Sequence, residues 1–312
     1  MIHTSAPATL MLMGEHAVLR NYPSLVAAAS PRLHVYITQR NDDIIQIKSS
    51  LGNYECTLNT IEIKPPFTFI LSLIKQFQKK LDHGFNLEVI SEFDATLGLG
   101  SSAATLMATA AALTKLSGKN PLSDPKALFK IAKKSLIEVQ GEGSGADLAA
   151  ALMGGIVYYK IKPLLMEKLP CEIPLVAIYS GSKMPTIEVI KMINIHEAEY
   201  QQYFEDIGKA VTLAKSALLD NDMALLSDAL ILNQNLMEQM HLANASITHI
   251  IKRLNLDSGI LAAKISGSGL GDCIIGLGGL NNTHFPEDDF EQSQGIKSLP
   301  LTLSPLGLIE HE

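Results

Sequence analysis

A glycine- and serine-rich stretch ahead of an alanine-rich run is the first feature that could do chemistry. It reads TLGLGSSAATLMATAAALTKL over residues 96–116. Glycines let the backbone turn tightly and approach an anion, and the first turn of a following helix offers unpaired amides and the positive end of its dipole. Gly98, Gly100, Ser101 and Ser102 are therefore expected to hold a polyphosphate. No lysine follows the serines, so this is not a Walker loop. A strand-to-helix turn without a ligand is the alternative.

A second glycine loop, KISGSGLGDC, covers residues 264–273 and precedes the apolar run CIIGLGG. Small residues fill five of the six positions 266–271. They again leave backbone amides free to approach a ligand. Taken alone, the loop could be a tight connection between two strands, but two such loops in one chain favour a ligand-binding role.

Two carboxylates and a histidine could act on a bound substrate. Asp147 follows a glycine–serine turn in QGEGSGADLAAALMGG (140–155), at the start of an alanine-rich run. It either stabilises a helix N-terminus or serves as a base facing a cavity. Glu15 and His16 directly follow an apolar strand and a glycine, where polar side chains face either a cleft or solvent.

The elements that must position these residues indicate an α+β protein with two lobes. Alternating residues predict strands in the first sixty positions, and Asp124 is suited to cap a helix that begins at Pro125. The first half is expected to contain helices over 66–81, from about 101, and 124–140, and strands over 85–93 and 154–161. The second half is expected to begin with a strand at 173–181, followed by helical structure over 186–253 with breaks near 220–222 and 244–246. Residues 260–279 are expected to form the end of a helix, then a glycine loop and then a strand. An exposed loop at 281–294 and a final strand at 299–309 are expected to follow. Residues 160–172 are the expected lobe boundary.

Composition excludes several classes of protein. The chain has 312 residues, is 47% hydrophobic and carries a net charge of −7, so it can bury a large core and is a poor partner for nucleic acid. Its three cysteines are too few and scattered for a disulfide framework or a zinc site. No signal peptide or spanning helix is indicated, so we expect a soluble cytoplasmic protein without a membrane partner.

Together these motifs resemble those of the GHMP small-molecule kinases over nearly the whole chain. The family pattern A-P-G-K, an apolar strand and G-E-H-A-V is similar to APATLMLMGEHAV, and its P-x-x-x-G-L-G-S-S-A-A is similar to DATLGLGSSAA. Its P-S-G-x-D resembles GSGAD, and its K-x-[ST]-G-[AS]-G-x-G resembles KISGSGLG. The pairing of GEHAV with GLGSSAA in the right order is specific.

The resemblance implies a fold, cofactors and roles. It implies a ribosomal-protein-S5-like ATP-binding lobe (1–165) and a ferredoxin-like α/β lobe (166–312), with the active site between them. ATP and Mg²⁺ are the implied cofactors, and Asp147 is the implied catalytic base for the acceptor hydroxyl. The implied phosphate-binding residues are Gly98, Leu99, Gly100, Ser101, Ser102 and Ala103. The implied substrate-binding residues are Glu15, His16, Thr186, Ser266, Gly267 and Gly269.

At three positions of the family pattern this chain has a different residue, and each replacement changes the charge expected at the site. The first-motif lysine is Thr9, the second-motif proline is Asp94, and the metal-binding glutamate falls at Leu136. Lys183 and Lys264 could supply the missing cation, and Lys183 is preferred because it lies near Thr186.

The metal ligands suggested by the resemblance are Ser102 and Glu138. Glu138 is the nearest acid to Leu136, but two residues along a helix is about 200° of rotation. Either the helix is shifted, or Glu138 or Glu142 substitutes, or phosphates, Ser102 and water hold the metal.

The resemblance leaves two acceptors open. GEHAV with NYPSLVAAAS, and NQNLMEQMHLANASITHIIKRL, look most like family members that phosphorylate mevalonate, an alcohol of isoprenoid precursor biosynthesis. VQGEGSGADLAAA and the GDC ending look like members that act on phosphomevalonate, the next step. Mevalonate is preferred. Because Thr9 replaces the lysine, a non-catalytic regulatory protein that binds ATP or a mevalonate-like ligand is the alternative from another class. A homodimer is compatible with the pattern.

Overall fold

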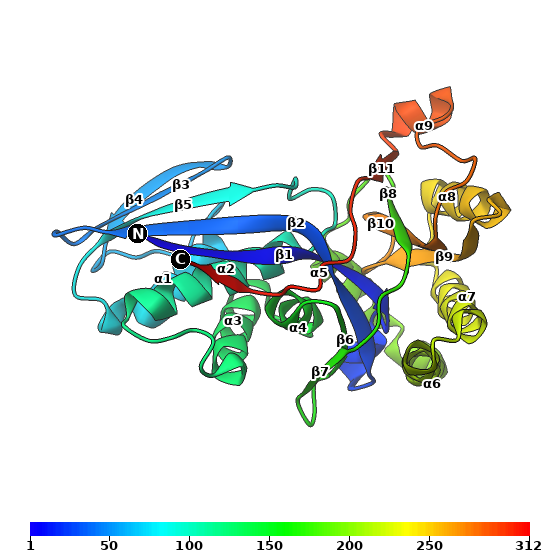
Figure 1. Cartoon of the computed structure of the whole chain (residues 1–312), viewed down its shortest axis with the longest axis horizontal. Coiled ribbons are helices and arrows are strands. Elements are labelled where there is room, and N and C mark those ends of the chain that lie inside the picture. Colours follow the sequence, from blue (N-terminus) through cyan, green and yellow to red (C-terminus); the bar gives the residue numbers. More distant parts are fainter.

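The computed structural model describes all 312 residues, which form two lobes, each built on a β-sheet (Figure 1). The first sheet has the strand order β12-β1-β2-β5-β3-β4, and β6 pairs with both β2 and β7. Its strands are β1 (Ile2–Met13), β2 (Ser24–Gln39), β3 (Ile44–Ser49), β4 (Gly52–Thr57), β5 (Phe85–Ser91), β6 (Ile156–Lys160), β7 (Leu165–Leu169) and β12 (Ile309–His311). All neighbouring pairs are antiparallel except β3 and β5.

Helices of the first lobe are α1 (Thr68–Phe77), α2 (Ser101–Leu116), α3 (Pro125–Gln140) and α4 (Ala146–Met153), with short 3₁₀ turns η1 (Ala17–Arg20) and η2 (Gln78–Lys80). The alanines of α2 are almost completely buried, and their small side chains let this helix lie close to β1 and β2. Asp124 caps α3, accepting a hydrogen bond from the amide of Ala127 at 2.9 Å, as its sequence position predicts.

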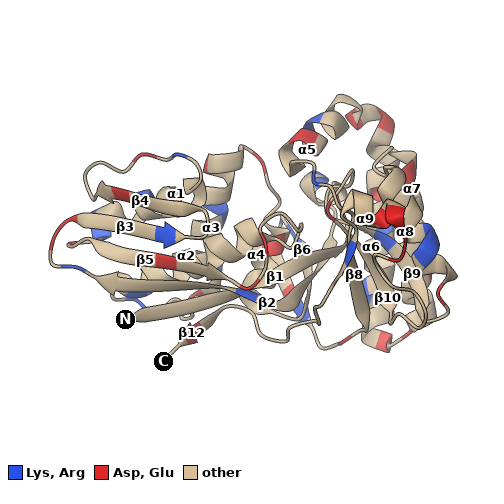
Figure 2. Ribbon diagram, turned by 90° about the horizontal axis from the view of Figure 1, so that it is seen from above, with Lys and Arg blue, Asp and Glu red and all other residues tan.

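The second sheet has the order β11-β8-β10-β9 and lies in the other lobe. Its strands are β8 (Leu175–Tyr179), β9 (Ile260–Ser266), β10 (Cys273–Gly278) and β11 (Lys297–Leu299). The helices of this half are α5 (Thr186–Ile195), α6 (Glu197–Asp220), α7 (Met223–Gln239), α8 (Ala245–Leu256) and α9 (Asp289–Gln294). Helices α7 and α8 pack on β9. Figure 2 shows α5 beside the junction of the two lobes.

Several predicted elements of the second half are wrong. Residues 260–266 form a strand, not a helix end; all of them except Leu261 are buried, so the alternation that marks a half-exposed strand is missing. The predicted exposed loop contains α9. The predicted strand 299–309 is mostly irregular because Pro300 and Pro305 interrupt it.

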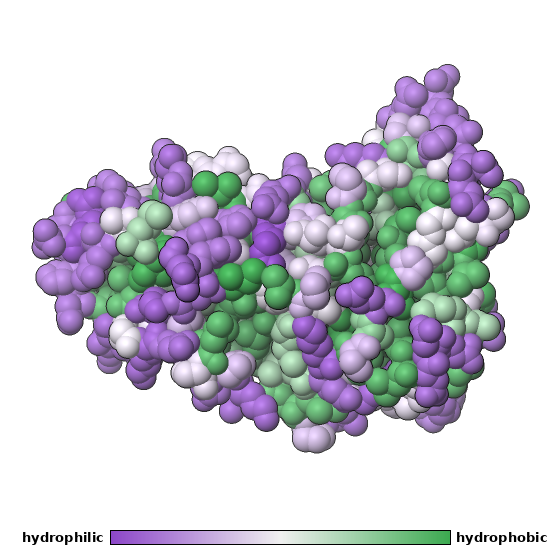
Figure 3. Space-filling model, in the orientation of Figure 1, coloured by the Kyte–Doolittle hydropathy of each residue, from purple (hydrophilic) through white to green (hydrophobic).

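The chain returns to its first sheet at the end. β7 lies in that sheet, Leu303 pairs with Ala29, and β12 pairs with β1, so both termini lie at the same end of the molecule (Figure 1). The expected lobe boundary at residue 165 therefore does not separate the two sheets, because β7 and the C-terminal β12 belong to the first sheet. Hydrophilic side chains gather at the far ends of the two lobes, around the β3–β4 hairpin and α9 (Figure 3). None of the helices combines the length and apolar composition that crossing a membrane requires.

Candidate active site

A cavity of about 440 Å³ lies where the two lobes meet, and both lobes line it. The first lobe contributes the end of β1, the start of α2, the end of α3 and the start of α4. The start of α5 and the loop between β9 and β10 close it from the second lobe. The two glycine loops, widely separated in sequence, therefore line the same cavity.

The glycine–serine loop meets the cavity as an open helix N-terminus. Gly100, with φ of 63°, precedes α2, and no side chain caps the helix. The amides of Ser101 and Ser102 have no hydrogen-bond acceptor within the chain. A Cβ on Gly100 would lie 1.8 Å from the Thr9 hydroxyl, so only glycine fits. Free amides at the positive end of a helix suit a phosphate group.

Leu99 differs from the other loop residues. Its side chain is buried in the core and is not part of the cavity wall, while its carbonyl accepts a hydrogen bond from the amide of Thr9 at 3.1 Å. Leu99 therefore anchors the loop on β1. Gly98, Gly100, Ser101, Ser102 and Ala103 do line the cavity.

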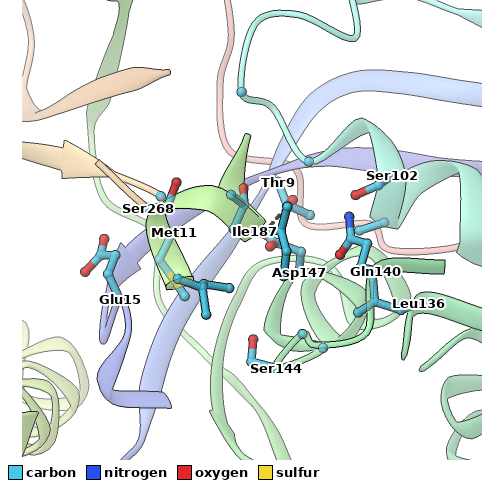
Figure 4. Close-up of a pocket in the computed structure, with 18 of the residues that line it drawn as sticks. Thr9, Met11, Glu15, Ser102, Leu136, Gln140, Ser144, Asp147, Ile187 and Ser268 are labelled. Atoms are coloured by element: carbon cyan, nitrogen blue, oxygen red, sulfur yellow. Dashed lines mark hydrogen bonds between the residues drawn. The ribbon is translucent and has the colours of Figure 1, made fainter. Parts of the chain in front are cut away.

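Asp147 faces the cavity from the first turn of α4 (Figure 4). Its Oδ1 accepts a hydrogen bond from the Thr9 hydroxyl at 2.8 Å. Burial raises the pKa of this carboxyl above its ordinary value, and the Thr9 hydrogen bond partly opposes the shift. A buried carboxylate of raised pKa that points into a cavity has the properties of a general base.

Asp272 lines the same cavity as Asp147 and lies at the end of the second glycine loop. Burial, together with the charge of Asp147, raises the pKa of Asp272 to about 6, although the cation of Lys183 opposes this. The Oδ1 of Asp272 is buried without a hydrogen-bond partner in the chain. A Cβ on Gly98 would lie 2.6 Å from the Cβ of Asp272, so the two glycine loops touch at this point.

Lys183 is the only lysine or arginine among the residues that line the cavity. Its ammonium donates a hydrogen bond at 2.9 Å to the carbonyl of Ala95, just before the glycine–serine loop. The other cation considered from the sequence, Lys264, is instead buried against Glu15, with 2.5 Å between Lys264 Nζ and Glu15 Oε1. Lys264 is therefore already neutralised by a partner.

Glu15 and His16 both line the cavity from the loop after β1. Glu15 also accepts a hydrogen bond from the side-chain amide of Asn233 at 3.3 Å. The Nε2 of His16 lies 2.8 Å from the carbonyl oxygen of Ser268, and burial lowers the pKa of His16 to about 4. His16 is thus neutral at pH 7, so neither residue adds an unbalanced charge.

The helix α3 presents Leu136 and Gln140, one turn apart, to the cavity near Ser102 (Figure 4). Glu138 is not part of the wall: its carboxylate accepts a hydrogen bond from the Ser72 hydroxyl on α1 at 2.6 Å. The expectation that Glu138 binds the metal is therefore not met, because two residues of rotation place it on the side that packs on α1. Glu142, after the helix ends, does line the cavity.

The oxygen atoms around the cavity suit Mg²⁺. The Ser102 hydroxyl and the carboxylates of Glu142, Asp147 and Asp272 are hard oxygen donors, and Asp272 Oδ1 has no partner within the chain. The three carboxylates do not converge within ligand distance of one another, so a magnesium ion would be held by one or two of them together with the Ser102 hydroxyl, phosphate oxygens and water.

The second lobe contributes Thr186, Ser266 and Gly267 to the cavity wall, as expected. Gly269 is an exception: a Cβ there would lie 2.8 Å from the Cβ of Leu242, so this glycine permits close packing away from the cavity. Ser268 lines the cavity in its place, and its buried hydroxyl has no partner in the chain.

Asp272 and Ser268 were not among the site residues predicted from the sequence. The available signal for Asp272 was an acid directly after a glycine-rich loop. For Ser268 the motif pattern emphasises the neighbouring glycines, so nothing in the sequence singles it out. The apolar side chains of Met11 and Ile187 were also missed; both line the cavity (Figure 4).

Comparisons with known proteins agree with this geometry. Residues 68–155 match the family model for the GHMP kinases N terminal domain, and residues 214–294 match that for the GHMP kinases C terminal domain. A mevalonate kinase of Archaeoglobus fulgidus is 31% identical over 279 residues, covering 88% of this chain and 91% of that protein. One of Thermococcus onnurineus is 29% identical over 298 residues, with 88% of each covered.

Solved structures share the fold at lower identity. The Methanococcus jannaschii mevalonate kinase superposes with a TM-score of 0.78 at 20% identity, covering 96% of this chain and 98% of that one. The Streptococcus pneumoniae phosphomevalonate kinase in complex with phosphomevalonate and AMPPNP gives 0.78 at 18% identity, with 100% of both chains covered. The family models and relatives confirm the membership inferred from the motifs: this chain belongs to the GHMP kinases and is a kinase that phosphorylates an alcohol.

Proposed function

We propose that this kinase transfers the γ-phosphoryl group of ATP to the primary hydroxyl of mevalonate, with Mg²⁺ as the metal. The charge of the cavity wall carries this proposal. Lys183 is its only lysine or arginine, and it lies against Ala95 beside the glycine–serine loop. Mevalonate brings one carboxylate, whereas phosphomevalonate adds about two further negative charges. A wall with no second cation favours the acceptor that carries less charge.

The acceptor side of the cavity supports the same choice. In Figure 4, Glu15, Met11 and Ser268 lie on one side of the Thr9–Asp147 pair, and Ser102 lies on the other. The nucleotide phosphates would occupy the Ser102 side, leaving the other side for the acceptor. The apolar side chains there suit the methyl-branched carbon chain of mevalonate.

A neutral site for the acceptor carboxylate is available at α5. The first turn of α5 lines the cavity, and the amides of Thr186 and Ile187 have no acceptor within the chain. Free amides at a helix N-terminus stabilise an anion without a side-chain cation. The buried Ser268 hydroxyl offers a further donor.

For phosphoryl transfer, the chain has to position the two reactants and stabilise negative charge on the transferring group. Bound ATP supplies the phosphoryl group, and Mg²⁺ neutralises charge on its phosphates. Asp147 accepts the proton of the acceptor hydroxyl, and Thr9 holds the Asp147 carboxylate in place through its 2.8 Å hydrogen bond. The amides of Ser101 and Ser102, together with Lys183, stabilise negative charge on the transferring group.

The test is release of ADP by the purified chain with MgATP and each of four acceptors: mevalonate, phosphomevalonate, homoserine and galactose. The highest kcat/KM is expected with mevalonate. A higher value with phosphomevalonate would assign the chain to the next step of the pathway. ATP binding without ADP release with any acceptor would support the regulatory alternative. That alternative rests on Thr9, which replaces the family lysine.

A further inference from the structure

Three histidines from three neighbouring strands meet on the first sheet, away from the cavity. His3 on β1 lies directly opposite His311 on β12, and His34 on β2 pairs with Ser5, two residues further along β1. Alternate residues of a strand share a face, so all three imidazoles lie on one face. Thr4, between His3 and Ser5, instead donates to the carbonyl of Ala108 on α2, so the histidines lie on the side away from the helices.

The ring nitrogens are close enough to share one ion. One nitrogen of each ring lies within 4.8 Å of the others. The Nε2 of His3 and the Nδ1 of His34 face each other at 3.0 Å. The rings of His3 and His311 stack with centroids 3.8 Å apart, so binding one ion requires these rings to rotate until their lone pairs converge.

The outer nitrogens have partners of the kind that orient metal-binding histidines. The Nε2 of His34 lies 3.3 Å from a carboxylate oxygen of Glu92. The Nε2 of His311 lies 2.8 Å from the Ser5 hydroxyl, which also accepts a hydrogen bond from Arg32 at 2.9 Å. The Glu92 carboxylate can only accept, so it favours the His34 tautomer whose Nδ1 is free to face inward, whereas the Ser5 hydroxyl can donate or accept and is compatible with either tautomer of His311.

A second group of potential ligands is already occupied. His249, Asp288 and Glu291 also lie within ligand distance of one another, but the guanidinium of Arg253 pairs with Glu291. The positive charge of Arg253 takes the place that a metal would need. No guanidinium pairs with any of the three sheet histidines. The guanidinium of Arg32 contacts Ser5 and the carbonyl of Gly307, but its charge does act on His311, whose pKa is lowered by burial and by the charges of His34 and Arg32.

We propose that His3, His34 and His311 form a Zn²⁺ site that fastens β12 to the first sheet. Three neutral imidazoles with a fourth position open to water are a donor set that Zn²⁺ accepts in tetrahedral geometry. The site would also restrain the segment before β12. There, the amide of Leu308 donates to the carbonyl of Leu152 at the end of α4, at 3.1 Å. The proposal does not depend on the acceptor assigned to the kinase.

The test is equilibrium dialysis of the tag-free chain against Zn²⁺, with bound metal measured by mass spectrometry. One equivalent per chain is expected. His34→Ala and His311→Ala should each weaken binding at least about tenfold, and Glu92→Gln by about tenfold through loss of the outer partner. The matched controls are His249→Ala in the second cluster and Glu88→Gln in β5, the strand that ends directly before Glu92. Both should bind as the wild type does.

Two further measurements separate the site from adventitious surface binding. Co²⁺ in place of Zn²⁺ should give the intense visible absorption of a tetrahedral ion, and Zn²⁺ should slow hydrogen exchange of the amides in Ile309–His311. Circular dichroism confirms that each variant is folded. Absence of saturable Zn²⁺ binding, equal binding by folded His34→Ala and His311→Ala variants, or unchanged exchange in β12 would each overturn the proposal.

Discussion

Lys183 is the only lysine or arginine in the cavity wall, and under the proposed function it is the cation that would meet the transferring phosphoryl group, since Thr9 supplies only a neutral hydroxyl where the family pattern has lysine. Lys183→Ala is expected to lower kcat/KM at least about tenfold, which corresponds to about 1.4 kcal/mol of transition-state stabilisation. Lys191→Ala, an exposed position on α5 outside the cavity wall, is the control and should leave kcat/KM unchanged. Equal kinetics for both variants would mean that Lys183 does not act on the reacting groups.

Asp272 should make stability depend on pH. Its pKa is raised from 3.8 to about 6, mainly by burial. A raised carboxyl pKa stabilises the fold below pH 3.8, and this contribution is lost as pH rises through about 6. The difference corresponds to about 3 kcal/mol. Asp272→Asn should therefore increase the free energy of unfolding relative to wild type at pH 7 to 8 but not near pH 3.5.

Urea denaturation at the two pH values measures this difference. Asp94→Asn is a suitable control, because Asp94 is exposed and its pKa is lowered by hydrogen bonds from Thr96, so its replacement should not stabilise the fold at neutral pH. A stabilisation of Asp272→Asn that is equal at both pH values would contradict the assigned titration.

At the scale of elements, the position of the first turn of α2 beside Thr9 depends on having glycine at residue 100. Replacing Gly100 with alanine strains a left-handed backbone and drives a Cβ into the Thr9 hydroxyl, 1.8 Å away. Gly118, two residues after the same helix ends, has a similar φ of 79°, but a Cβ there would meet nothing within 4 Å, so Gly118→Ala is the control. Both variants should lose stability, but only Gly100→Ala should lose kcat/KM, by about tenfold or more, because it displaces the Thr9–Asp147 pair.

Steady-state kinetics and thermal unfolding of the two variants, measured side by side, check this. A similar loss of activity in both would show that backbone strain alone, and not contact with Thr9, limits catalysis.

Much of the site could be predicted because its motifs are local. Gly98 to Ser102 form a turn ahead of a helix, and their residue types are enough to predict it. The metal ligand on α3 could not be chosen in the same way: Glu138 was preferred, although helical rotation argued against it, and its carboxylate contacts Ser72 instead. The contact of Asp272 with Gly98 and the pairing of Lys264 with Glu15 join residues far apart in the sequence. Only the tertiary structure brings those pairs together. Gly269 was misassigned because a glycine that allows packing and one that lines a cavity look alike in sequence.

At the scale of the whole molecule, the Glu15–Lys264 ion pair connects the two sheets. Glu15 follows β1 of the first lobe, Lys264 lies in β9 of the second, and both side chains are 1% exposed. Glu15→Gln leaves the Lys264 ammonium buried without its counter-charge, so the free energy of unfolding should fall by about 3–5 kcal/mol. The double variant Glu15→Gln/Lys264→Met should recover part of this loss, because it removes the unpaired charge.

Chemical denaturation of the single and double variants measures the coupling. Glu88→Gln breaks the exposed Lys48–Glu88 pair and should change stability little. A double variant that is no more stable than Glu15→Gln would show that the pair does not stabilise the junction through its charges.

The central claim is that Asp147 accepts the acceptor's proton in a cavity that phosphorylates mevalonate. Asp147→Asn is nearly isosteric but cannot accept that proton at neutral pH. The decisive measurement is kcat for mevalonate-dependent ADP release by this variant, with ATP affinity measured in parallel. The account predicts that kcat falls by about 10²-fold or more while ATP affinity is retained. An Asp147→Asn variant that turns over mevalonate at the wild-type rate would contradict it.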